Sequence, residues 1–262
     1  MSKPKIVFFD IDDTLYDYDK KIPESTVEAV HRLQKDGVIT AIATGRAPFM
    51  FQDLRAQLDI HTFISINGSY VVHQDEAVYT NPLQDSALHA LVEKADELGW
   101  SMTLVNEKTM KMAGPVDEKA KKGIASLKLP IAFPEQDAHF AEDHPVYQGL
   151  LFYSEADNSR FLKETPFNAF RYVRWHEYGV DVIPGSGSKA AGIKQLLNRL
   201  NLTPEDACAF GDGNNDVEML AYVGTGIAMG NAVDAAKKSA KRVTTPVDQD
   251  GIYYGLKEIG LL

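Results

Sequence analysis

The sequence predicts an α/β fold, in which helices cover both faces of a parallel sheet, with a separate α+β domain inserted into it. In the first part of the chain, short all-apolar segments alternate with helical segments, a pattern typical of parallel strands buried on both faces. In the middle, segments such as 100–114 alternate apolar and polar residues, as half-exposed antiparallel strands do. The first pattern returns after Pro184, so the middle domain interrupts the alternating one.

The alternating domain is expected to consist of buried strands connected by helices. Pro23 and Gly37 mark the two ends of its first helix, because they are common at these positions. We predict strands at 5–9, 38–44, 62–67, 207–212, 225–230 and 242–245. We predict helices at 23–37, 48–58, 188–201, 215–224 and 232–241.

The middle of the chain predicts an open antiparallel sheet with helices. A hairpin is expected at 70–80, and further strands at 100–114, 147–154 and 170–184. Helices are expected at 86–99, 116–127 and 155–164. We therefore assign residues 1–80 and 184–262 to the alternating domain and residues 81–183 to the inserted domain, since insertions are tolerated where chain ends lie close together.

Composition excludes several classes of protein. The chain has 262 residues, of which 44% are hydrophobic, so it can bury a full core and is not disordered. A net charge of −10 disfavours nucleic acid and anionic membranes as partners. The single cysteine, Cys208, lies in an apolar run and is expected to be buried in the core. Without a signal peptide or a membrane span in the sequence, we expect a cytoplasmic monomer or homodimer.

Polar and acidic residues follow three of the predicted buried strands, at the edge of the sheet where ligands bind. Close carboxylates need a cation, and oxygen ligands on compact loops favour Mg²⁺. Carboxylates, a hard cation and hydrogen-bond donors together fit phosphoryl transfer on a small phosphorylated molecule. The residues concerned are Asp10, Asp12, Thr44, Gly45, Arg46, Asp212, Asn215 and Asp216, with Lys189 at the start of the helix before the third strand.

In this order, DIDDTL, ATGR, Lys189 and GDGNND resemble the four motifs of the haloacid dehalogenase superfamily of phosphatases. The similarity continues to GIAMGNA and DQDGI near the end of the chain. The inserted domain is similar to the large α/β cap of the Cof-type subfamily. The resemblance implies a Rossmann-like core, a mobile cap and Mg²⁺-dependent hydrolysis of phosphate monoesters such as sugar phosphates.

The resemblance also implies a role for each motif residue. Asp10 would be the nucleophile that forms an aspartyl-phosphate, and Asp12 the acid and base. Mg²⁺ would be bound by Asp10, the backbone carbonyl of Asp12 and Asp212, with Asp216 nearby and linked to the ion through water. The phosphoryl oxygens would be held by Thr44, Lys189, Asn215 and the backbone of Ile11 and Gly45. Because Asp12 must be protonated at the start, we expect its pKa to be raised relative to that of Asp10.

Other interpretations stay open at this stage. A phosphotransferase or mutase of the same superfamily would pass the phosphoryl group to a second hydroxyl, and a regulatory binding module would keep the fold without turnover. Asp13 stands where glycine is usual in Cof-type sequences, and we expect it to point away from the site. Substrate choice is expected to depend on the inserted domain, with candidates in 105–112 and 171–179, and on Arg46 and Phe49.

Overall fold

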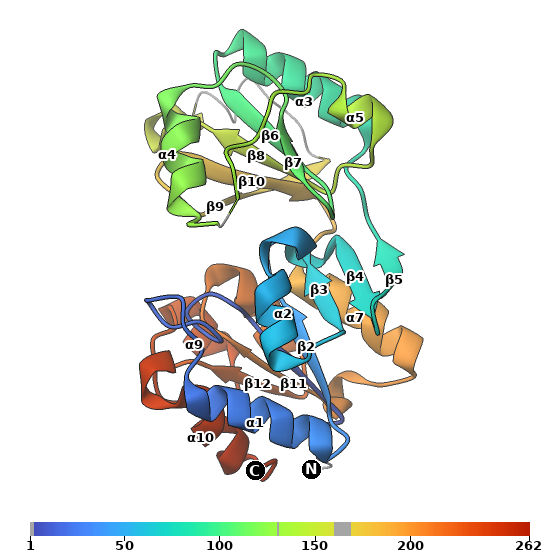
Figure 1. Ribbon diagram of the computed structural model, residues 1–262, viewed down its shortest axis with the longest axis vertical. Helices are drawn as coiled ribbons and strands as arrows, with labels where there is room; N and C mark the ends of the chain where they lie inside the picture. The colour runs from blue at the N-terminus through green and yellow to red at the C-terminus, as the bar shows by residue number, and fades with distance from the viewer. Residues whose placement is uncertain (1–2, 130, 160–168) are drawn as a thin grey trace. The chain divides into compact units, whose positions relative to one another are not determined.

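The structure is a computed structural model that describes residues 3–129, 131–159 and 169–262, and it forms two compact units (Figure 1). The first unit comprises Met1–Arg46, Phe51–Thr80 and Ser188–Leu262. The second comprises Ala47–Met50 and Asn81–Gly187. Each unit has its own sheet and its own hydrophobic core.

The first unit is built on one eight-stranded sheet. Its strands are β1 (Ile6–Phe9), β2 (Ile39–Ala43), β3 (Phe63–Ser65), β4 (Tyr70–His73), β5 (Glu76–Thr80), β11 (Ala207–Gly211), β12 (Thr225–Ala228) and β13 (Arg242–Val243). Their order is β13-β12-β11-β1-β2-β3-β4-β5, and the pairs from β13 to β3 are parallel. The predicted parallel α/β sheet is confirmed. The hairpin predicted at 70–80 is present as β4 and β5, but its placement in the antiparallel sheet of the middle of the chain is wrong, because it pairs with β3 and extends this sheet with two antiparallel strands.

Helices of the first unit form two groups on the two faces of this sheet (Figure 1). They are α1 (Glu24–Lys35), α2 (Gln52–Leu58), α7 (Lys189–Leu200), α8 (Val217–Tyr222), α9 (Asp234–Ser239) and α10 (Gly251–Glu258). Helix α1 packs against α2 and α10, whereas α8 packs against α7 and α9. The helix predicted at 48–58 is wrong in extent, because a 3₁₀ turn over Pro48–Met50 precedes α2 and Phe51 between them has non-helical backbone angles. Helix α10 was not predicted.

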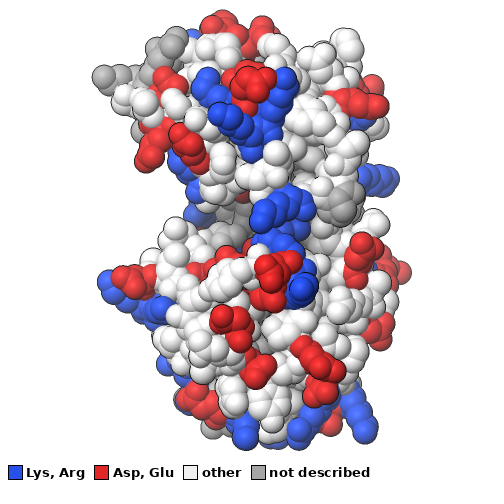
Figure 2. Space-filling view, turned by 60° about the vertical axis from the view of Figure 1, so that its left-hand side comes forward, with Lys and Arg blue, Asp and Glu red and all other residues white. Residues whose placement is uncertain are grey.

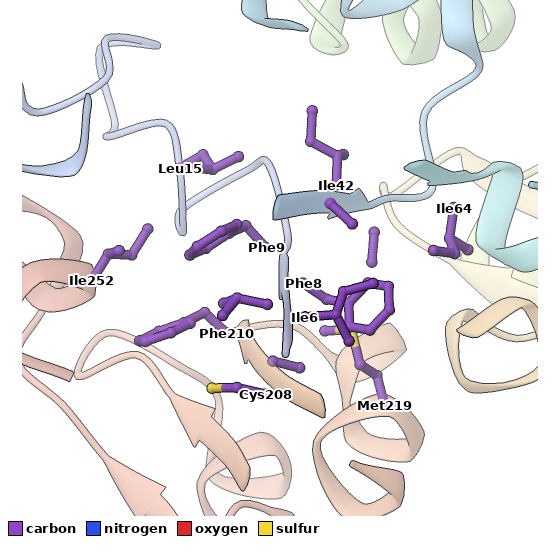
Figure 3. Close-up of a cluster of buried hydrophobic side chains, with 14 of the residues drawn as sticks. Ile6, Phe8, Phe9, Leu15, Ile42, Ile64, Cys208, Phe210, Met219 and Ile252 are labelled. Carbon is purple, nitrogen blue, oxygen red and sulfur yellow. The ribbon is translucent and has the colours of Figure 1, made fainter. Parts of the chain in front are cut away.

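The core of the first unit lies around its three central strands, β11, β1 and β2 (Figure 3). Phe9 and Phe210 are paired in register on neighbouring strands, and their rings stack with centroids 5.5 Å apart. Cys208 is fully buried beside them on β11, and this burial raises the pKa of its thiol. As predicted, Cys208 is a core residue, and its raised pKa makes it a poor nucleophile.

Removing the Phe210 ring should destabilise the first unit strongly. For Phe210→Ala we expect a loss of about 3–5 kcal/mol in the free energy of unfolding, because the change leaves a cavity against Phe9. Urea unfolding followed by circular dichroism measures it. Tyr254→Ala is the matched control, since Tyr254 is 48% exposed on α10 and its loss should change the same free energy by about 0.5 kcal/mol or less. Equal effects of the two changes would contradict the assignment of the core.

The second unit is an α+β domain with a five-stranded antiparallel sheet. Its strands are β6 (Ser101–Val105), β7 (Met110–Met112), β8 (Gln148–Phe152), β9 (Phe170–Arg174) and β10 (Gly179–Pro184), in the order β7-β6-β8-β10-β9. The described residues of this unit include the helices α3 (Asp85–Glu97), α4 (Glu118–Ser126) and the unpredicted short α5 (Phe140–Asp143). The antiparallel α+β prediction is confirmed. Half of the helix predicted at 155–164 lies outside the described residues, and its described half consists of a 3₁₀ turn over Glu155–Asp157 followed by helical residues at 158–159.

Among the helices of the described residues, none is long and apolar enough to cross a membrane. On the face shown in Figure 2, acidic and basic side chains are interspersed over both units. Neither sign dominates this face, whereas an extended basic surface is the usual electrostatic footprint of a nucleic-acid-binding protein.

Candidate active site

The segment after β1 turns back sharply and places Asp10 at the carboxyl end of the central strand. The Asp10 backbone N–H donates to the Phe210 carbonyl at 3.0 Å, and the N–H of Tyr16 donates to the Ile11 carbonyl at 2.8 Å. Asp13 has left-handed backbone angles (φ 56°), and its carbonyl accepts a hydrogen bond from the Asn231 amide at 2.8 Å. Asp10 is therefore held at the sheet edge with 7% of its surface exposed.

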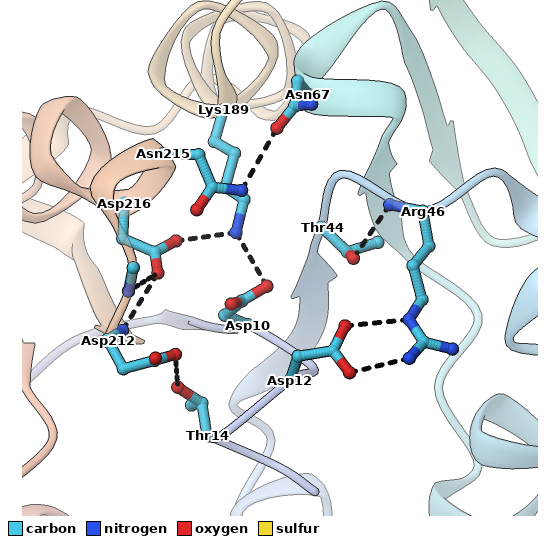
Figure 4. Close-up of polar contacts among 11 residues, drawn as sticks. Asp10, Asp12, Thr14, Thr44, Arg46, Asn67, Lys189, Asp212, Asn215 and Asp216 are labelled. Atoms are coloured by element: carbon cyan, nitrogen blue, oxygen red, sulfur yellow. Dashed lines mark hydrogen bonds and ion pairs between the residues drawn. The ribbon is translucent and has the colours of Figure 1, made fainter. Parts of the chain in front are cut away.

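Lys189 lies at the centre of the site and is completely buried (Figure 4). Its Nζ donates to Asp10 Oδ1 at 2.7 Å and to Asp216 Oδ1 at 2.6 Å. Burial alone would lower the pKa of Lys189, but the charges of Asp10 and Asp216 outweigh it and raise that pKa above its usual value. Ser188 caps the start of α7 through a hydrogen bond from the Ala191 N–H, and so fixes where the lysine enters the site.

Three carboxylates surround this one ammonium group. Oxygens of Asp10, Asp212 and Asp216 lie within 4.8 Å of one another. Burial, and next the charge of Asp216, raise the pKa of Asp10 well above its usual value and that of Asp212 to about 7. Carboxylates that repel one another in this way, with only one cation among them, fit a site for a divalent ion with oxygen ligands.

The three carboxylates differ in how fully they are already bonded. Asp212 Oδ1 accepts one hydrogen bond from the Thr14 hydroxyl at 3.0 Å. Asp216 uses both oxygens, since Oδ1 accepts from Lys189 and Oδ2 accepts from the backbone N–H groups of Asp212 and Gly213 at 2.9 and 2.8 Å. Asp216 therefore has less freedom than Asp10 or Asp212 to bind an ion directly.

Asp12 departs from the expectation for its pKa. Arg46 donates to both of its oxygens, at 2.8 and 2.7 Å, and the Lys20 ammonium donates to Oδ1 at 2.7 Å (Figure 4). Burial by itself raises the pKa of Asp12, but Arg46 and Lys20 outweigh it, so this pKa lies below its usual value while that of Asp10 lies above. The predicted order of the two pKa values is therefore reversed in this state, because Arg46 reaches Asp12 from the loop after β2 and Lys20 reaches it from further along the segment between β1 and α1.

Two further motif residues, Thr44 and Asn215, lie near Asp10 and Lys189 (Figure 4). Thr44 follows β2 and is buried, and its hydroxyl oxygen accepts a hydrogen bond from the Arg46 N–H at 3.1 Å. The side-chain amide of Asn215 donates to Asn67 Oδ1 at 3.2 Å. The Asn67 side chain also packs against Gly45, where an added Cβ atom would lie 3.1 Å from Asn67 Nδ2.

The structure thus brings the predicted site residues of all four motifs together within the first unit. Sequence reasoning missed Thr14, Lys20, Asn67 and Asn231, each of which contacts a motif residue or the loop that carries one. The sequence predicted Asn67 only as the last residue of a strand at 62–67, whereas the structure places it in the turn after β3. The one available signal was that this turn follows a buried strand at the same edge of the sheet.

The second unit contains a pocket of about 290 Å³. It brings Phe49 together with Lys108, Lys111 and Phe133, so one of the two candidate segments for substrate choice, 105–112, lines it. In the other segment, 171–179, the guanidinium of Arg174 donates to the carbonyls of Tyr153, His176 and Glu177. Because these hydrogen bonds go to backbone carbonyls of its own unit, the Arg174 guanidinium stabilises the local structure beside β9.

Comparison with known proteins agrees with this geometry. The pattern of the haloacid dehalogenase-like hydrolase family matches residues 7–256. The chain is 46% identical over 258 residues to "Putative phosphatase YkrA" of Bacillus subtilis (strain 168), and the match covers 98% of both chains.

Solved structures extend the likeness to the fold. The crystal structure of a hypothetical protein from Geobacillus kaustophilus HTA426 is 45% identical, with a TM-score of 0.92 over 99% of this chain and 100% of that one. The subclass IIB sugar phosphatase BT4131 is 29% identical, with a TM-score of 0.86 over 98% of this chain and 100% of that one. The chain therefore belongs to the haloacid dehalogenase-like hydrolases, among the Cof-type phosphatases of that family.

Proposed function

We propose that the protein is a Mg²⁺-dependent phosphatase that hydrolyses small phosphate monoesters, such as sugar phosphates, through an aspartyl-phosphate on Asp10. The observation that carries this proposal is the buried arrangement of Asp10, Lys189, Asp212 and Asp216 at one sheet edge. A nucleophilic carboxylate divides a difficult displacement into two easier ones. The choice of sugar phosphates is supported by the name of BT4131, a sugar phosphatase.

In the proposed first step, an Asp10 oxygen attacks phosphorus, the bond from phosphorus to the leaving oxygen breaks, and Asp12 gives its proton to that oxygen. In the second, water attacks the phosphorus of the aspartyl-phosphate, Asp12 takes a proton from the water, and the Asp10–phosphorus bond breaks to release phosphate. Thr44, Lys189, Asn215 and the backbone N–H groups of Ile11 and Gly45 would hold the phosphoryl oxygens during both steps.

Mg²⁺ would be held by Asp10, Asp212 and the backbone carbonyl of Asp12, with Asp216 beside them. When bound, such an ion offsets negative charge on the carboxylates and the phosphoryl group. The raised pKa values of Asp10 and Asp212 support this assignment, because a cation at the cluster favours the ionised carboxylates that the reaction requires.

The ion pairs of Asp12 suit the second step of this mechanism. An ionised Asp12, held by Arg46 and Lys20, is ready to accept a proton from water. To act as an acid in the first step, Asp12 must carry a proton, which requires its contacts with these two cations to weaken. We infer that a change in the Arg46 and Lys20 contacts accompanies substrate binding.

We further propose that residues 1–80 and 184–262 form the catalytic core and that the inserted residues 81–183 act as a cap that selects the substrate. The pocket to which Lys108, Lys111 and Phe133 contribute supports this role, since these inserted residues combine apolar surface with positive charge. The single cysteine, which excludes an internal disulfide, supports a location in a reducing compartment such as the cytoplasm.

Phosphatase activity should require Mg²⁺. With a panel of phosphorylated metabolites, we expect free phosphate from at least one ester in Mg²⁺, a loss of at least about 100-fold in excess chelator, and recovery when Mg²⁺ is restored. Phosphate release measured with a colorimetric reagent gives the result, and Asp10→Asn protein prepared in parallel corrects for contaminating phosphatases. Full turnover in excess chelator would contradict the metal assignment, and transfer to a second hydroxyl without free phosphate would favour a phosphotransferase.

A further inference from the structure

A strained turn lies between β3 and β4, directly beside the proposed phosphoryl site. Ile66 and Asn67 have successive left-handed backbone angles, with φ of 51° and 47°, and both are buried. A β-branched residue such as isoleucine rarely adopts positive φ. Backbone conformations of this kind persist only where the surrounding structure imposes them, and they gather at functional sites.

The turn is bonded to the loop that carries Thr44 and Gly45. The Asn67 N–H donates to the Thr44 carbonyl at 3.1 Å, and the Ile66 N–H donates to the Arg46 carbonyl at 3.1 Å. The residues on both sides of Gly45 are therefore fixed by the turn. The Asn67 side chain lies against Gly45 itself, so a Cβ atom there would be 3.1 Å from Asn67 Nδ2 and 3.2 Å from Asn67 Oδ1.

The turn also contacts the first turn of α7, which begins with Lys189. Gly68 has a φ of 92°, and an added Cβ atom would lie 2.0 Å from the Ser188 carbonyl oxygen. A Cβ atom on Gly192 would lie 2.8 Å from the Gly68 Cα. Backbone therefore packs directly on backbone here, and the position of Lys189 depends on the turn.

Asn215 is a further proposed phosphoryl-binding residue that the turn contacts, because its side-chain amide donates to Asn67 Oδ1 at 3.2 Å (Figure 4). We propose that Asn67 is a positioning residue that sets the spacing of Thr44, Gly45 and Asn215 around the phosphoryl group. This inference rests on the proposed function, which makes those residues the phosphoryl-binding groups. It predicts that Asn67 governs affinity for the phosphoryl group whatever the leaving group is.

The test measures binding of inorganic phosphate by calorimetry in Mg²⁺, together with kcat/KM for an aryl and an alkyl phosphate. Asn67→Gly and Asn67→Asp both tolerate a left-handed backbone, so the turn should survive. Asn67→Gly removes the contact with Asn215, and we expect phosphate affinity and both kcat/KM values to fall together by about five-fold or more. Asn67→Asp keeps the shape but adds a negative charge, so we expect a larger loss, at least about ten-fold.

Asn201 provides the matched control. It also has a left-handed backbone, with a φ of 54°, but it is exposed at the far end of α7. Asn201→Gly and Asn201→Asp should leave phosphate binding unchanged. A loss of phosphate affinity with these variants as large as with the Asn67 variants would overturn the inference, since the effect would then be a general one of substitution.

A second arm uses the crowding at Gly45. Gly45→Ala should weaken phosphate binding because the new methyl group displaces Asn67. In a protein that already carries Gly45→Ala, Asn67→Gly should then reduce phosphate affinity by a smaller factor than it does in the otherwise native protein. Losses of phosphate affinity that add up independently in the double variant would contradict the contact between Gly45 and Asn67.

If the native protein releases phosphate from no ester, the proposed function fails. If the native protein is active and Asn67→Gly binds phosphate equally well, only the positioning role of Asn67 fails.

Discussion

Asp10→Asn is expected to be inert in both steps, with kcat/KM reduced on the order of 10⁴-fold to 10⁶-fold. The amide keeps the shape of the carboxylate but cannot attack phosphorus or form the acyl-phosphate. The change also removes one of three repelling carboxylates around Lys189, so the protein should be at least as stable to heat as the native form. Rapid-quench kinetics with an activated aryl phosphate, together with a thermal melt, measures both outcomes.

Asp12→Ala is the informative partner of this change. A good leaving group needs little protonation, so Asp10 should still attack phosphorus in this variant, and the phosphoenzyme should form. Hydrolysis of the phosphoenzyme lacks its base, and we expect a burst of aryl alcohol near one equivalent, followed by turnover slowed about 10²-fold to 10⁴-fold. Mass spectrometry of the trapped peptide should find phosphate on Asp10. Phosphate on another residue, or a burst from Asp10→Asn, would overturn the assignment of the nucleophile.

The convergence of the four motifs could be predicted because it depends on a simple property of parallel sheets. Asp10, Thr44 and Asp212 each follow an apolar strand, and the carboxyl ends of β1, β2 and β11 meet at one edge. Lys189 was found because the motif order places it at the start of a helix. Local sequence patterns were sufficient to predict where these residues lie, since each is positioned by the strand or helix next to it.

The partners of the motif residues could not be predicted, because they come from distant parts of the chain. Arg46 lies 34 positions from Asp12, and Asn67 lies 148 positions from Asn215. No periodicity or turn signal reports such pairs. The reversed order of the Asp10 and Asp12 pKa values in this state has in part the same origin, since the sequence shows neighbouring carboxylates but not that Arg46 folds back onto one of them.

Lys189→Met should lower both activity and stability. In the proposed mechanism Lys189 faces the phosphoryl oxygens, so its loss should reduce kcat/KM by at least about 10²-fold to 10³-fold, because such donors act in a site closed to water. The same change leaves Asp10 and Asp216 buried without their partner, since Lys189 is bonded to both and is fully buried. Removing one member of a buried ion pair costs about 3–5 kcal/mol of the free energy of unfolding. Steady-state kinetics and urea unfolding measure the two effects.

Two comparisons separate a role in phosphoryl binding from a role in folding alone. Lys5→Met removes a lysine whose ion pair with Asp206 is at the surface, with the Lys5 side chain 62% exposed, so activity and stability should both change little. If Mg²⁺ occupies the carboxylate cluster, adding it should restore part of the lost stability of Lys189→Met, because a divalent ion also offsets the repulsion. Activity should stay low, since the ammonium that the proposed mechanism places against the phosphoryl group is still missing. Recovery of both stability and kcat/KM in Mg²⁺ would mean that Lys189 serves the fold and that other residues hold the phosphoryl group.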